Sequence, residues 1–167
     1  MKILYVASEA FPLAKTGGLA DVASGLPAAL AGLGQDVRIM VPAYPGTADL
    51  VEGKKREIGL GDPLEAGETR LIEARMPDTG VPVWLVDCPS LFARDGGPYT
   101  DTHGQDWADN HLRFALLARA AAMVCVAGEM AGWSPHILHA NDWQTGLAAA
   151  YLVQWGGPRP ASLFTIH

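Results

Sequence analysis

The sequence predicts an α/β protein with a doubly wound, mostly parallel sheet, and three observations support this class. Short, continuous apolar runs alternate with stretches of helical periodicity along the chain. Such runs are typical of strands that are buried on both faces, as in parallel sheets. The chain has 167 residues, of which 49% are hydrophobic and 18% are charged. It can therefore bury the core of one domain, and this composition excludes a disordered chain.

The N-terminal part predicts a strand, a helix and a second strand. The apolar run 3–7 predicts the first strand, residues 18–32 predict the helix, and Asp36–Pro42 predicts the next strand. Pro27 lies inside the helical stretch, where a proline costs about 3 kcal/mol unless the helix kinks or restarts. The candidate capping residues are Ser24 for a restarted turn, and Gly32 and Gly34 for the C-terminal end.

The remaining chain continues the alternation of strands and helices. Three strands separated by glycine- and proline-containing turns are predicted in the middle, followed by a loop and then by a helix, a strand, a helix and a strand. In chain order, the predicted segments are strands 54–60, 69–76 and 81–87, loop 88–105, helix 106–127, strand 136–140, helix 144–155 and strand 162–166. The apolar residues of 106–127 cover two faces, which predicts a largely buried helix.

Charge and cysteine content limit the functional classes. The net charge is −6 and the pI is near 5.2, which argues against a nucleic acid or a membrane surface as a partner but allows a local phosphate site. Cys88 and Cys125 lie in apolar runs and are expected to be buried thiols in a reducing cytoplasm, with a disulfide as the alternative. The first apolar run is too short for a signal peptide, and no run of 18 apolar residues predicts a membrane span.

The segment that follows the first strand is the first candidate site. Parallel sheets bind ligands beyond the carboxyl ends of their strands. Gly17 and Gly18 open the predicted helix, where free amides and the helix dipole favour an anion, and Lys15 adds a positive charge. Asp21 lies one turn into the helix and is placed to accept hydrogen bonds from a hydroxylated ligand. The alternative is a flexible turn in which Asp21 is an ordinary first-turn charge.

The ends of the later strands supply the other candidates. Asp142 follows strand 136–140 and either faces a polar ligand or caps the next helix. His167 follows the last strand, in a position that suits an active-site imidazole, although a lone histidine is more often structural. Tyr99 lies in a loop that can reach the same edge. His136 and His139 are three residues apart on a predicted strand and so point to opposite faces, which argues against a metal site.

Two nucleotide-binding motifs are absent. The first strand is followed by no G-x-G-x-x-G, and the second strand ends without the acidic residue that binds a ribose, which argues against a nicotinamide or flavin oxidoreductase. Lys15 precedes the glycines rather than following them, so the segment is not a Walker loop.

Three segments together resemble the bacterial glycogen synthases and plant starch synthases. The chain resembles this family throughout its length, and the first segment is the most specific. The three segments are Lys15–Val22 (KTGGLADV), His139–Leu147 (HANDWQTGL) and Phe164–His167 (FTIH). The resemblance implies a metal-free, cofactor-free glucosyltransferase with two Rossmann-like domains, the GT-B architecture. Such enzymes transfer glucose from ADP-glucose to the non-reducing end of an α-1,4-glucan with retention of configuration.

The resemblance also implies roles for the candidate residues. Lys15, Gly17 and Gly18 would lie near the sugar phosphate, Asp21 and Tyr99 in the same cleft, and Asp142 and His167 would contact the glucosyl unit as catalytic residues. Residues 1–167 would form the N-terminal domain, truncated at its C-terminal end and lacking the second nucleotide-binding domain, so the chain alone is predicted to be inactive. The alternatives are a related transferase that uses UDP-glucose and a non-catalytic, glucan-binding single domain.

Overall fold

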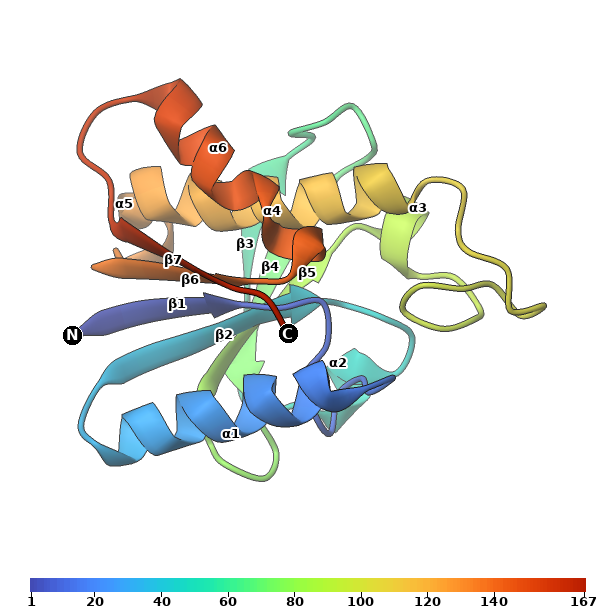
Figure 1. Cartoon of the computed structure of the whole chain (residues 1–167), viewed down its shortest axis with the longest axis horizontal. Coiled ribbons are helices and arrows are strands. Elements are labelled where there is room, and N and C mark those ends of the chain that lie inside the picture. The colour runs from blue at the N-terminus through green and yellow to red at the C-terminus, as the bar shows by residue number, and fades with distance from the viewer.

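The computed structural model contains one seven-stranded sheet with helices on both faces (Figure 1). It describes the backbone of residues 1–167 and every side chain other than those of Lys54, Glu129 and Met130. The strands are β1 (Lys2–Val6), β2 (Asp36–Pro42), β3 (Glu52–Gly61), β4 (Thr69–Arg75), β5 (Pro82–Asp87), β6 (Ile137–Asn141) and β7 (Ala161–Thr165). The helices are α1 (Gly18–Gly32), α2 (Thr47–Leu50), α3 (Pro89–Phe92), α4 (Asn110–Val126), α5 (Gly128–Ala131), the 3₁₀ turn η1 (Trp143–Thr145) and α6 (Leu147–Trp155).

The sheet is mostly parallel, as predicted. Its strand order is β3-β4-β5-β2-β1-β6-β7, and the five strands from β5 to β7 are parallel to one another. β4 is antiparallel to both of its neighbours, so the hairpin β3–β4 extends one edge of the sheet. The chain passes from β1 to β2 on one side and reaches β6 on the other. The strand order therefore reverses beside β1, the point where open α/β sheets bind ligands.

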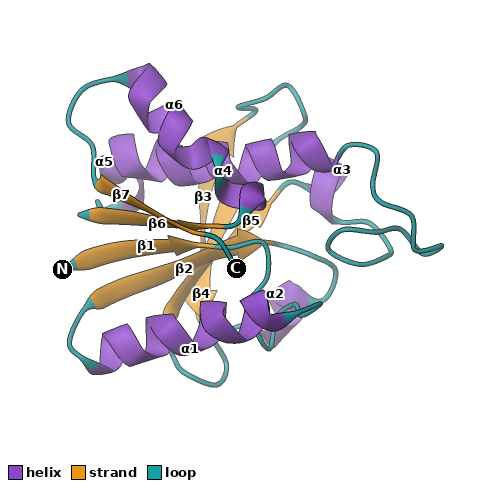
Figure 2. Cartoon of the chain, viewed as in Figure 1, coloured by secondary structure: helices purple, strands orange, loops and turns teal.

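Two apolar cores cover the two faces of the sheet. α1 packs on one face, and α4 and α6 pack on the other (Figure 2). The central strands are buried on both sides because their side chains alternate between these cores. In β1, for example, Leu4 belongs to the core with α4, whereas Tyr5 belongs to the core with α1. This double burial is the physical reason for the continuous apolar runs in the sequence.

The predicted ends of several elements need correction. α1 is a single helix that contains Pro27, and Ser24 is buried within it, so a restarted turn capped by Ser24 is wrong. Gly34 follows the helix with a φ of +79°, and its N–H donates to the carbonyl of Ala31 at 2.9 Å, which confirms its capping position. The strand predicted over 136–140 begins at Ile137 instead.

The predicted helix over residues 106–127 also begins later, at Asn110. Asp106 forms an isolated bridge with Thr100, and the N–H of Trp107 donates to the carbonyl of Tyr99 at 3.0 Å. These backbone contacts hold the first residues of the predicted helix in the preceding loop. The core of α4 is buried as expected, with Phe114, Leu117 and Ala121 at most 2% exposed.

Candidate functional site

A cleft of about 520 Å³ lies at the carboxyl ends of β1 and β6. This is the position where the strand order reverses, so the topology and the cavity indicate the same site. The cleft is lined by Glu9, Gly17, Gly18, Leu19, Val22, Tyr99, Asp142, Gln144 and His167. Five of the residues singled out in the sequence are thereby brought together, namely Gly17, Gly18, Tyr99, Asp142 and His167.

The loop between β1 and α1 is held by a buried carboxylate. Glu9 is 2% exposed, and its Oε2 accepts hydrogen bonds from the backbone N–H of Thr16 at 2.5 Å and from the Thr16 hydroxyl at 2.8 Å. The bonds fix the residue directly before Gly17. Neither Gly17 nor Gly18 has a protein atom within 4 Å of the position that a Cβ would occupy. Their open surroundings leave the first amides of α1 accessible to a ligand.

Lys15 and Asp21 lie beside this helix end and pair with each other. The Lys15 ammonium lies 2.7 and 2.8 Å from the two carboxylate oxygens of Asp21, and the two side chains are 47% and 56% exposed. An exposed pair of this kind contributes little stability, at most about 1 kcal/mol. A ligand can therefore separate Lys15 from Asp21 at low cost.

Asp142 has a strained backbone conformation at the end of β6. Its φ of 57° and ψ of 179° fall in a region that is occupied almost only by glycine. Its side chain makes no capping hydrogen bond to η1, so the alternative that Asp142 caps the next helix is wrong. Instead, Oδ1 accepts a hydrogen bond from the backbone N–H of His167 at 2.7 Å. A carboxylate accepts at both oxygens, so this contact leaves capacity for a hydroxyl ligand. Strain held in place beside a cleft is typical of functional residues.

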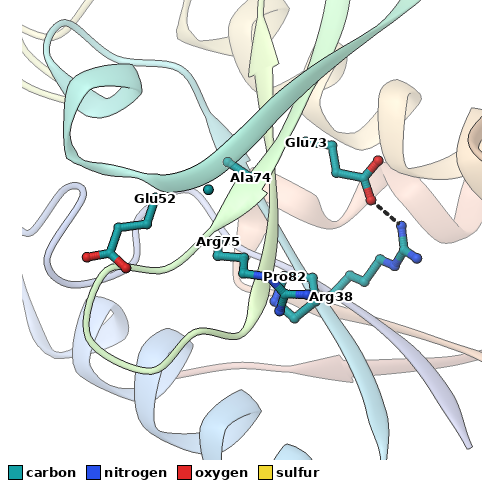
Figure 3. A pocket seen from close by; sticks show the side chains of 7 residues that line it. Arg38, Glu52, Glu73, Ala74, Arg75 and Pro82 are labelled. Carbon is teal, nitrogen blue, oxygen red and sulfur yellow. Dashed lines mark hydrogen bonds and ion pairs between the residues drawn. The ribbon is translucent and has the colours of Figure 1, made fainter.

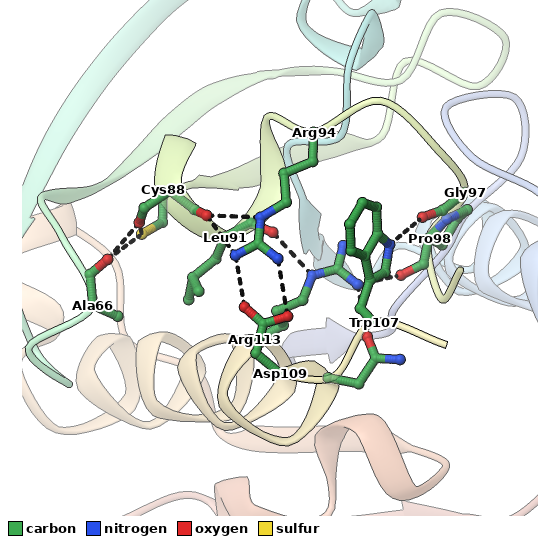
Figure 4. A network of polar contacts seen from close by, with 11 residues as sticks. Ala66, Cys88, Leu91, Arg94, Gly97, Pro98, Trp107, Asp109 and Arg113 are labelled. Carbon is green, nitrogen blue, oxygen red and sulfur yellow. Dashed lines mark hydrogen bonds and ion pairs between the residues drawn. The ribbon is translucent and has the colours of Figure 1, made fainter. Parts of the chain in front are cut away.

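Tyr99 follows Gly97 and Pro98, whose carbonyls accept hydrogen bonds from Trp107 and Arg113 (Figure 4). Arg113 of α4, 1% exposed, donates to the carbonyls of Leu91 and Pro98 at 2.9 and 2.8 Å. The indole N–H of Trp107 donates to the carbonyl of Gly97 at 3.1 Å. These bonds place Tyr99 so that its hydroxyl lies 2.8 Å from the Ser8 hydroxyl, and burial raises the pKa of the tyrosine above its usual value.

A second, smaller hollow of about 210 Å³ lies at the other edge of the sheet (Figure 3). It is lined by Arg38, Glu73 and Arg75, among others, and Arg38 pairs with Glu73 at 2.9 Å. The Arg38 guanidinium also lies 4.7 Å from the ring centroids of both Trp84 and Trp133. Because the ion pair with Glu73 and the two indole rings hold the Arg38 guanidinium in place, we interpret this cluster as structural.

Two polar residues that line the cleft, Glu9 and Gln144, were not predicted from the sequence. Glu9 directly follows the first strand, and an acidic residue at that position was a usable signal. Gln144 is 7% exposed, and its side-chain oxygen is buried without a hydrogen-bond partner within the described part of the chain. Gln144 was not predicted as a cleft residue, because it is the first residue of the helix predicted over 144–155.

The comparisons with known proteins identify the family of the chain. The family model described as starch synthase catalytic domain matches residues 2–167. The chain belongs to this family. The resemblance read from the sequence motifs is thereby confirmed.

Members of the starch synthase family match the chain along its whole length. The glycogen synthase of Rhodospirillum rubrum is 55% identical over 167 residues, and that of Paramagnetospirillum magneticum is 56% identical over 169 residues. Each match covers 100% of this chain but 34% of the relative. The chain therefore spans about a third of the length of these relatives.

A solved structure of the same family shares the fold. The catalytic domain of starch synthase IV from Arabidopsis thaliana, bound to ADP and acarbose, superposes with a TM-score of 0.77 at 27% identity. The match covers 99% of this chain and 33% of that one. The doubly wound sheet is thus the fold of one part of a GT-B starch synthase, as the sequence predicted.

Three further observations concern the cysteines, the candidate metal ligands and the helices of the described residues. Cys88 and Cys125 are free and buried, so the alternative of a disulfide is wrong. Among the residues described, no group of three or more His, Cys, Asp or Glu side chains is arranged to hold a metal ion. Within the same part of the chain, no helix is long and apolar enough to cross a membrane.

Proposed function

We propose that the chain is the N-terminal domain of a cytoplasmic glycogen or starch synthase, which transfers glucose from ADP-glucose to the non-reducing end of an α-1,4-glucan. The observation that carries this proposal is the joint placement of Asp142 and the amides of Gly17 and Gly18 around one cleft. The ADP and acarbose bound to the starch synthase IV structure support a nucleotide donor and a sugar-like acceptor. The second nucleotide-binding domain would lie in the part of such enzymes that this chain does not span.

The cleft suits the charges that develop during glucosyl transfer. As the bond between glucose and diphosphate lengthens, positive charge grows on the sugar and negative charge on the phosphate. The amides at the N-terminus of α1, with Lys15 released from Asp21, would stabilise the phosphate. Asp142 would hold a hydroxyl of the glucosyl unit and favour its positive charge, with His167 and Tyr99 beside it. The resemblance to this family implies that the transfer needs no metal.

The test uses the full-length enzyme that contains this chain, with incorporation of labelled glucose into glycogen as the assay. Lys15→Ala is expected to weaken the use of ADP-glucose, because it removes the ammonium beside the cleft, and Asp142→Asn to lower turnover, because it removes a carboxylate that lines the cleft. The matched controls are Lys2→Ala and Asp78→Asn, which change the same residue types at the amino ends of the parallel strands, away from the cleft. Unchanged kinetics in the cleft variants would contradict the assigned roles.

The same assay separates the alternatives. Incorporation from UDP-glucose in place of ADP-glucose would identify the related transferase. Binding of maltooligosaccharides by the full-length protein without incorporation from either donor would indicate a non-catalytic glucan-binding protein. The 167-residue chain alone is expected to incorporate no glucose, and measurable incorporation by it would contradict a requirement for the second domain.

A further inference from the structure

The His167 imidazole is joined to a buried polar network beneath the cleft. Its Nε2 lies 3.2 Å from Oδ1 of Asn141, the last residue of β6. Asn141 is 0% exposed, and the same Oδ1 accepts a hydrogen bond from the Tyr5 hydroxyl at 3.0 Å. Three strands therefore converge on one amide oxygen, since Tyr5 belongs to β1 and His167 follows β7.

The orientation of the Asn141 amide follows from its other contacts. Its Nδ2 donates to the backbone carbonyl of Val6 at 3.0 Å and to that of His139 at 3.3 Å. A flipped amide would place its oxygen against these two carbonyl oxygens, with no hydrogen between the three acceptors. Oδ1 must therefore face Tyr5 and His167. Because this oxygen can only accept, the hydrogen between it and His167 must belong to the histidine.

We propose that Asn141 is a positioning residue that, together with Tyr5, holds the His167 imidazole in the tautomer with hydrogen on Nε2. This tautomer leaves Nδ1 as the acceptor of the ring. Resting on the function proposed above, we infer that His167 accepts a hydrogen bond from a hydroxyl of the glucosyl unit and does not donate one.

The surroundings of His167 are consistent with this assignment. Asp142 contacts the backbone N–H of His167, not its ring, and Glu9 and Tyr99 line the same cleft. Burial and the nearby Asp142 raise the pKa of Tyr5 to about 12, so its hydroxyl remains a donor to Asn141 at neutral pH.

The second histidine of the network has a separate partner. The Nε2 of His139 lies 2.8 Å from the Thr165 hydroxyl. Its pKa is lowered by burial and by His167, so it adds little positive charge at neutral pH. Thr165 thus offers a control position inside the same network that leaves the bond between Asn141 and His167 intact.

Nitrogen NMR of the ¹⁵N-histidine-labelled chain tests the tautomer without any substrate. Long-range proton–nitrogen correlations at pH 8, with His167 assigned through a His167→Gln variant, distinguish the protonated from the bare ring nitrogen. The expected result is hydrogen on Nε2 and a bare Nδ1. Hydrogen on Nδ1, or an equal mixture of tautomers, would overturn the proposal. Since no turnover is measured, failure of the proposed function leaves this result unaffected.

Two substitutions test the role of Asn141 itself. Asn141→Leu removes the oxygen that accepts from Nε2 and keeps a similar size, so hydrogen should no longer be held on Nε2 of His167 and both tautomers should appear. Thr165→Val should leave the tautomer of His167 unchanged. Hydrogen still held on Nε2 in a folded Asn141→Leu chain would contradict the role of Asn141. If that variant fails to fold, the tautomer of the unmodified chain still decides.

Discussion

Replacing Asp142 by alanine and by glycine should reverse the usual order of stability of these two residues. Both substitutions remove the carboxylate and its bond to His167, so the comparison isolates the backbone. Alanine retains the strain at a φ of 57° and a ψ of 179°, which costs about 1–3 kcal/mol, whereas glycine adopts this conformation freely. Glycine loses about 0.5–1 kcal/mol through its greater chain entropy. We therefore expect Asp142→Gly to be more stable than Asp142→Ala by about 1 kcal/mol, within a range of about 0–2.5 kcal/mol.

Urea unfolding at pH 7, followed by circular dichroism, measures this difference. The matched control is Ala150→Gly on the exposed side of α6, where glycine should be less stable than alanine by about 1 kcal/mol. An Asp142→Ala chain more stable than Asp142→Gly would refute the argument that the backbone at this position is strained.

Three further predictions concern buried groups. Arg113→Met should lower the unfolding free energy by at least about 2 kcal/mol, because the carbonyls of Leu91 and Pro98 lose their buried donor; a smaller loss in urea titrations would count against this anchor. Burial lowers the pKa of His139, so the unfolded chain binds the proton more readily and the free energy of unfolding should fall as the pH drops below about 6.5. His139→Gln should reduce this fall. Identical plots of unfolding free energy against pH for the two chains would contradict the prediction. Burial raises the pKa of Cys125 to about 12, so iodoacetamide at pH 8 should modify this thiol only in urea, as peptide mass spectrometry would show; rapid modification of the folded chain would disprove it.

The sequence predicted the sheet well because its strands are buried on both faces. The strands predicted over 3–7 and 81–87 are observed as Lys2–Val6 and Pro82–Asp87, because a short, continuous apolar run bounded by turns is typical of a buried strand. The four-residue helices α2, α3 and α5 were missed, since one turn is too short to show a helical period. The start of α4 was placed too early because its boundary depends on contacts of the preceding loop, which no local pattern records.

The candidate site was predicted in position but not in contacts. The rule that strand ends meet at one edge was enough to group Gly17, Asp142 and His167. It could not show that Lys15 and Asp21 pair with each other, or that Asp142 is strained. These properties depend on side-chain geometry and on the backbone of neighbouring strands. Likewise, the function of Asn141 becomes visible only when three strands are placed side by side.

The bond between Lys15 and Asp21 has a consequence for selectivity between anions. In the absence of ligand, the nearest ammonium is already neutralised by a carboxylate, and Glu9 and Asp142 add negative charge to the lining. A small free anion, such as inorganic phosphate, therefore meets little attractive potential there. A ligand that also brings hydroxyls for Asp142 can compensate for breaking the pair. On the function proposed above, the resting cleft is therefore expected to bind phosphate alone more weakly than a ligand that also carries hydroxyls.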